Sequence, residues 1–112
     1  MLNAVWGWFL AFFFTQVFEV PIYWWATKSL RISFFASAIT HPIVWFVFPL
    51  LMTVGVEYWP MVALAELFAV IVEAAWLRWN GIPLGKSALT SLAANSFSVC
   101  CGFAMRHFFG FP

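Results

Sequence analysis

The sequence predicts an all-α integral membrane protein in which four transmembrane helices form a compact bundle. Apolar residues make up 65% of the 112 residues, and charged residues only 8%. A soluble domain has about 25% charged residues, because its surface must be hydrated. The high aromatic content, with 15 Phe and 8 Trp, suits a surface that contacts lipid. The lipid bilayer is therefore the first expected partner.

The four helices are expected where long apolar stretches occur, at about residues 5–25, 32–54, 61–79 and 87–105. Each stretch is close to the ~20 residues that a helix needs to cross a ~30 Å hydrocarbon core. The stretches show no alternation of polar and apolar residues, which argues against membrane-spanning strands. The breaks between them are short, so neighbouring helices must be antiparallel. We expect a single transmembrane domain, residues 1–112.

The orientation of the bundle is predicted from its basic residues. Four of them flank the first and third breaks: Lys28, Arg31, Arg78 and Lys86. The second break carries Glu57, and only Arg106 lies near the C-terminus. Positive residues prefer the cytoplasm, so both termini are expected on the non-cytoplasmic side. Aromatic residues predict an interfacial belt at each side: Tyr23, Trp24, Trp25, Trp76 and Trp79 inside, and Trp6, Trp8, Tyr58 and Trp59 outside.

The chain also resembles itself when it is shifted by 54 residues. The shift places Glu19 on Glu73 and His41 on Asn95 without a gap. Matched polar residues carry weight because polar residues are scarce here. We therefore expect two tandem helical-hairpin repeats, residues 5–54 and 59–108. Two hairpins of the same topology would be related by a pseudo-two-fold axis along the membrane normal.

Ionisable and amide side chains within the apolar stretches form the candidate site. The candidate residues are Gln16, Glu19, Ser37, His41, Glu66, Glu73, Ser91 and Asn95. An ionised side chain at a helix centre costs about 2.5–3.5 kcal/mol on insertion scales. Such residues should therefore face the bundle interior, where they pair with one another or hold a proton. The four polar stripes should converge on the axis of the bundle.

Glu19 and His41 are expected to form a buried pair. Glu19 lies nine residues before Lys28, and His41 lies ten residues after Arg31. At 1.5 Å rise per residue, both side chains sit roughly 13–15 Å from the first break. They belong to adjacent antiparallel helices at the same depth. Glu73 is expected to be shallower, because only five residues separate it from Arg78.

Three functions are compatible with this cluster. It handles or transports a proton or a small cation, with the chain acting as a homo-oligomer. Alternatively, it joins helices in an accessory subunit of a larger membrane complex. A third hypothesis is a membrane-embedded metal-dependent enzyme. The chain has one candidate His and no metal-binding spacing, so the sequence leans against an enzyme. No metal or cofactor is therefore expected. The net charge of +1 excludes a nucleic-acid partner. The adjacent Cys100 and Cys101 indicate no disulfide framework.

The predicted orientation can be tested by cysteine-accessibility labelling. In a background with Cys100 and Cys101 replaced by Ser, single cysteines at Lys28 and Lys86 should react only from the cytoplasmic side. A cysteine at Glu57 should react only from the other side, because positive residues are retained in the cytoplasm. The opposite labelling pattern would overturn the orientation.

Overall fold

The computed structural model describes residues 2–110, and the predicted all-helical bundle is confirmed within them. Its elements are α1 (Leu2–Thr27), α2 (Leu30–Phe46), the 3-10 helix η1 (Phe48–Val54), α3 (Tyr58–Trp79) and α4 (Leu84–Phe109). Four spans in this range are long and apolar enough to cross a membrane, the second of them running through α2 and η1. The predicted domain, residues 1–112, extends past the described range at both ends. The longest dimension, 38 Å, exceeds the ~30 Å hydrocarbon core.

The sequence predicted one continuous helix over residues 32–54, but the structure divides this span into two helices. The α-helix ends at Phe46, and the chain continues as η1 with Pro49 in its first turn. A proline has no N–H to donate, and its ring collides with the carbonyl four residues earlier. The next amide, that of Leu50, donates to Val47 at 3.0 Å, which is the tighter spacing of a 3-10 helix. Pro42, by contrast, is accommodated inside α2.

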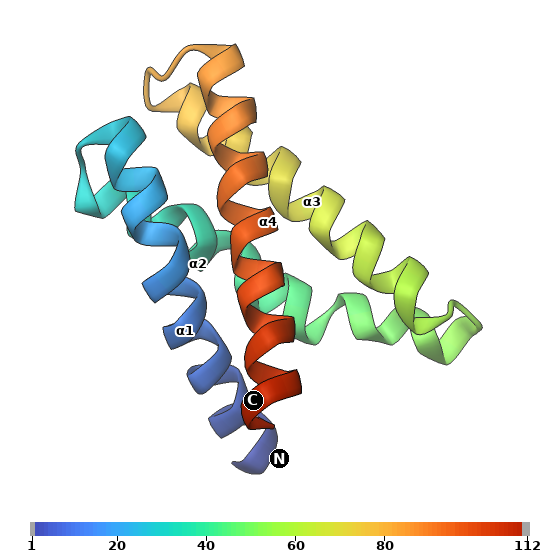
Figure 1. Ribbon diagram of the computed structural model, residues 1–112. Helices are drawn as coiled ribbons and strands as arrows, with labels where there is room; N and C mark the ends of the chain where they lie inside the picture. The colour runs from blue at the N-terminus through green and yellow to red at the C-terminus, as the bar shows by residue number, and fades with distance from the viewer. Residues whose placement is uncertain (1, 111–112) are drawn as a thin grey trace.

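The two hairpin turns lie at the same end of the bundle, and the N- and C-termini lie at the opposite end (Figure 1). The first turn begins with Lys28 in the left-handed region, and the Ser29 side chain caps α2 by accepting the Ile32 N–H at 3.2 Å. The ammonium groups of Lys28 and Lys86 lie over the rings of Trp24 and Trp25. Basic and aromatic side chains therefore meet at this end, as they do at membrane interfaces.

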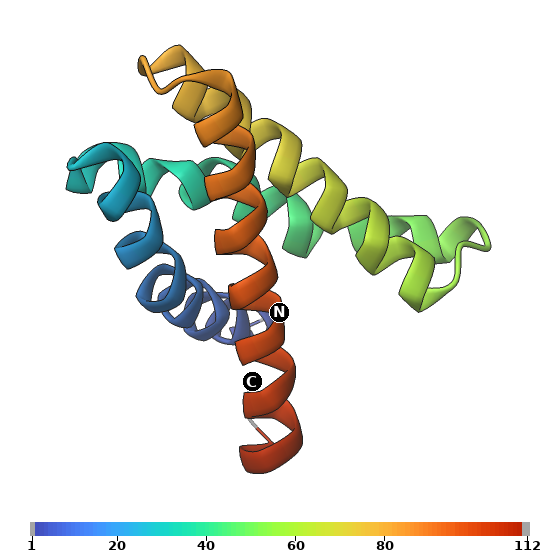
Figure 2. The same ribbon diagram turned by 45° about the horizontal axis from the view of Figure 1, so that its top comes forward.

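The helices pack in cyclic order. α1 contacts α2 and α4, while α3 also contacts α2 and α4. The pair α2 and α3 diverges from α1 and α4 away from the hairpin turns, where η1 leads into α3 (Figures 1 and 2). The bundle is thus tight at the end with the hairpin turns and wider at the end with the termini.

Small residues allow the close approach of the helices. Ala36 and Ala94 are fully buried and form one apolar cluster with Tyr23 and Leu77. Small side chains at helix interfaces are typical of membrane bundles, where van der Waals contact replaces the hydrophobic effect. The large apolar side chains instead cover the outside; among the most exposed are Trp6, Trp25, Leu67, Trp79, Leu89 and Phe108.

The close packing predicts that Ala94→Leu destabilises the bundle. The larger side chain has no space at this fully buried position, and overpacking typically costs about 1–3 kcal/mol. Ala93→Leu, at the exposed neighbouring position, is the matched control and should leave stability unchanged. Thermal unfolding of both variants in detergent micelles measures the difference. Equal melting temperatures would contradict the packing described for α4.

Candidate functional site

The Glu73 carboxyl of α3 lies at the centre of the bundle and is 1% exposed. It accepts a hydrogen bond from the Tyr23 hydroxyl of α1. It also accepts one from the Thr40 hydroxyl of α2 at 2.6 Å, and one from the Asn95 amide of α4 at 3.1 Å. One carboxyl group therefore connects all four helices.

These donors affect the ionisation of the Glu73 carboxyl. Tyr23 and Asn95 both donate to Oε1, and Thr40 donates to Oε2. Hydrogen bonds to an ionised acceptor are shorter and about twice as strong as those between neutral groups. Each of these three hydrogen bonds is therefore stronger when Glu73 is ionised, whereas the burial of its carboxyl opposes ionisation.

Asn95 is itself held in place by further hydrogen bonds. Its side-chain nitrogen also donates to the Ser91 carbonyl at 2.9 Å. The Ser91 hydroxyl in turn donates to the Val70 carbonyl of α3 at 2.7 Å. The orientation of the Asn95 amide is therefore fixed by α4 and α3 together, which aims its N–H at Glu73.

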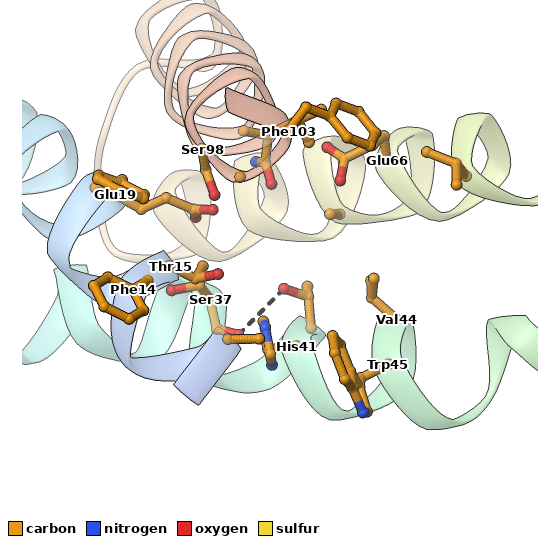
Figure 3. A pocket seen from close by; sticks show the side chains of 18 of the residues that line it. Phe14, Thr15, Glu19, Ser37, His41, Val44, Trp45, Glu66, Ser98 and Phe103 are labelled. Atoms are coloured by element: carbon orange, nitrogen blue, oxygen red, sulfur yellow. Dashed lines mark hydrogen bonds between the residues drawn. The ribbon is translucent and has the colours of Figure 1, made fainter. Parts of the chain in front are cut away.

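Glu19 is the second buried carboxyl, 3% exposed, and it lies beside Glu73. Its neighbour on α4 is the Ser98 hydroxyl, toward which the carboxyl is turned (Figure 3). Within residues 2–110, Glu19 Oε1 has no hydrogen-bond partner. The two glutamates thus differ: donors surround Glu73, while Glu19 keeps one oxygen unpaired.

The expected Glu19–His41 pair is not formed, and this prediction was wrong. His41 Nδ1 has no hydrogen-bond partner among the described residues. Its ring packs instead against Trp8, Phe12 and Trp45, with centroid separations of 6.0, 5.3 and 6.2 Å. In Figure 3, His41 lies with Trp45 on α2, while Glu19 turns toward α4. A similar depth does not bring the two side chains together, because the rotation of each helix about its axis turns them toward different neighbours.

A cavity of about 250 Å³ extends from these carboxyls. Its lining includes Glu19, Ser37, Thr40, His41, Glu66, Glu73, Asn95 and Ser98, together with Trp45, Tyr58, Phe103 and Arg106 toward the wide end of the bundle. On every helix the lining runs from the level of Glu73 away from the hairpin turns. On the other side of Glu73, Tyr23 and Leu77 are 0% exposed and close the interior. The carboxyl pair therefore lies at the inner end of a cavity that extends in one direction.

The structure brings most of the predicted site residues together. Six of them line the cavity: Glu19, Ser37, His41, Glu66, Glu73 and Asn95. Gln16 is outside it and donates to the Phe34 carbonyl at 3.2 Å, which joins α1 to α2. Ser91 also lies outside the lining and supports Asn95. Glu73, which was expected to be shallower than Glu19 and His41, lies at the centre of the network.

Sequence reasoning missed two partners of Glu73. Tyr23 was assigned to an interfacial belt, but it is fully buried, so this assignment was wrong. Tyr23 follows Glu19 by four residues and therefore shares its helix face. Thr40 follows Ser37 by three residues on the polar face of α2. Extension of both polar stripes by one helical turn would have identified these hydroxyl groups.

No protein-family model, curated protein or solved structure matches the chain. Within residues 2–110, no group of three or more His, Cys, Asp or Glu side chains could hold a metal ion. The cavity instead presents carboxyl, hydroxyl and amide groups between aromatic walls. This chemistry suits the binding of protons and of weakly hydrated cations.

Tyr23→Phe should destabilise the protein, because it removes one donor from the buried Glu73 carboxyl. Loss of a hydrogen bond to a buried acceptor costs roughly 1–3 kcal/mol. Tyr58→Phe is the control and should have little effect, because it removes only a long, exposed hydrogen bond from Arg106 Nη1 at 3.5 Å. Chemical unfolding in detergent micelles compares the two variants.

The same measurement, applied to double mutants, distinguishes the observed network from the predicted pair. Tyr23→Phe and Glu73→Gln should be non-additive by at least ~0.5 kcal/mol, as expected for residues in contact. Glu19→Gln and His41→Ala should add within ~0.5 kcal/mol. Strong coupling between Glu19 and His41 would contradict the geometry described above.

Proposed function

We propose that this chain is a multi-pass membrane protein that binds a proton between Glu19 and Glu73 and exchanges it in the course of transport. A small cation could take the place of the proton. The observation that carries the proposal is the pair of adjacent buried carboxyls at the inner end of a cavity. Two ionised carboxylates side by side in a medium of low dielectric repel each other strongly. A proton or cation held between them removes that repulsion.

The two carboxyls have different roles in this proposal. Glu73, with donors from Tyr23, Thr40 and Asn95, is the fixed anion. Glu19 is the exchangeable proton carrier, since one of its oxygens is unpaired and its side chain lines the cavity. A proton on Glu19 can then be shared with the Glu73 carboxylate. The Ser98 hydroxyl beside Glu19 would serve as a partner when the proton has left.

The proposal also gives the exchange a direction. The lining of the cavity extends toward the termini, which the distribution of basic residues predicts to lie on the non-cytoplasmic side. Tyr23 and Leu77 close the route toward the hairpin turns. The proton would therefore enter from the non-cytoplasmic side. Passage across the membrane would require Tyr23 and Leu77 to separate. A homo-oligomer would supply additional helices around the route.

A tandem duplication would account for the carboxyl pair. The buried residues of α2 are Ser33, Ala36, Ser37, Thr40 and His41. The buried residues of α4 are Ser87, Thr90, Ser91, Ala94 and Asn95, which are the same positions shifted by 54. Both helices also begin at equivalent residues, Leu30 and Leu84. Two hairpins related by a pseudo-two-fold axis along the membrane normal would each contribute one glutamate to the bundle axis.

The second candidate is an accessory subunit, and the hydrogen bonds of Glu73 favour it. A network that joins four helices would also serve assembly, because hydrogen bonds between membrane helices contribute about 0.6–2 kcal/mol each. Such a subunit would purify with stoichiometric partner chains. A transporter would act alone or as a homo-oligomer.

Proton flux into proteoliposomes tests the proposal. Purified protein should carry protons across the membrane, and Glu19→Gln should abolish this flux, because the amide cannot exchange a proton. Glu57→Gln, outside the cavity lining, is the control and should retain the wild-type rate. Flux that persists in Glu19→Gln would refute the assigned role. Absence of flux from the wild-type protein, together with co-purifying partner chains, would establish the subunit instead.

A further inference from the structure

The outer part of the cavity has a different chemistry from its inner end. There the lining includes the aromatic side chains of Trp45, Tyr58 and Phe103 together with the carboxyl of Glu66. A second cavity of about 300 Å³ shares Trp45, Tyr58 and Glu66 with the first. Together, the adjoining cavities reach the size of small-molecule sites, which occupy about 300–1,000 Å³.

Glu66 is the acidic group of this outer region. It lies seven residues before Glu73 and thus on the same face of α3, but it takes no part in the hydrogen bonds around Glu73. Its side chain is half-buried and lines both cavities. Arg106 also lines both cavities, and its Nη1 donates a hydrogen bond to the Tyr58 hydroxyl at 3.5 Å. Three carboxyl groups and one guanidinium group line the cavities, so acidic groups predominate.

Aromatic side chains beside a carboxyl group favour one class of ligand. The face of an aromatic ring attracts cations, and cages of such rings bind quaternary ammonium groups. A small inorganic ion would lose its hydration shell against the apolar walls formed by Val44 and Val62. An alkylammonium ion is weakly hydrated and has apolar groups that contact such walls favourably.

We propose that the outer cavity binds a small monovalent organic cation, with Glu66 as its counter-charge and Trp45, Tyr58 and Phe103 as its walls. The binding site stands on its own residues, while its coupling to protons rests on the function proposed above. A cation near Glu66 and a proton on Glu19 share one cavity of low dielectric, so each disfavours the other. The transported species would then be an organic cation that exchanges against protons.

Isothermal titration calorimetry of the purified protein in detergent micelles tests this site with two matched probes. Choline carries a quaternary nitrogen, and 3,3-dimethyl-1-butanol has a neutral carbon in its place. Choline should give saturable binding, and the neutral probe should give none. Glu66→Gln should weaken choline binding about tenfold or more, which corresponds to a loss of about 1.4 kcal/mol. Glu57→Gln, outside both cavities, should bind choline as the wild type does.

A second pair of variants keeps the test decisive if Glu66→Gln fails to fold. Trp45→Leu removes one aromatic wall and should also weaken choline binding, whereas Trp6→Leu, at a position 63% exposed, should not. Equal binding of both probes, or choline binding unaffected by Glu66→Gln and Trp45→Leu, would overturn the proposal. So would the absence of saturable choline binding. If proton flux through Glu19 persists in that case, the organic-cation site alone is refuted. If choline binds as expected but Glu19→Gln leaves proton flux unchanged, the proton site alone is refuted.

Discussion

The fold depends on the burial of one carboxyl group at the centre of four apolar helices. A carboxylate in such a place is costly unless donors surround it. Glu73 obtains its donors from Tyr23, Thr40 and Asn95, one on each of the other helices. The rotation of every helix about its axis is constrained by this requirement. Small residues such as Ala36 and Ala94 then allow the backbones to approach closely enough for these short side chains to meet.

The same constraint explains why the bundle is closed at one end and open at the other. Near the hairpin turns, Tyr23 and Leu77 fill the axis and leave no exposed surface. Toward the termini, α2 gives way to η1 at Pro49, and α2 and α3 diverge from α1 and α4. Large aromatic side chains line the resulting space without filling it. The cavity therefore reaches the carboxyl pair from one direction, as the proposed exchange would require.

The proposed tandem repeat would not produce a symmetric site. At equivalent positions, Glu73 is hydrogen-bonded by Asn95, whereas Glu19 has no such bond to His41. The His41 ring packs among aromatic side chains of α1 and α2, and Glu19 turns toward Ser98. A second difference is that Tyr23 donates to Glu73, while its counterpart Leu77 can donate to nothing. Donors surround one carboxyl group, while one oxygen of the other is unpaired, and this asymmetry would supply the two roles in the proposed proton exchange.

The sequence by itself determined the four apolar helices, their short antiparallel connections and the set of polar residues within them, because hydropathy and helical period are local properties. It also indicated that Glu19, Glu66, Glu73 and Asn95 share an interior, since lipid is the only alternative for them. Only the tertiary structure decided which of these residues meet. The depth of a residue along a helix follows from residue counting. Which side chains come into contact depends on the rotation and tilt of each helix, and these are determined by many contacts between residues distant in the sequence. For that reason Tyr23 was expected at an interface and Glu19 beside His41, whereas packing placed Tyr23 on Glu73.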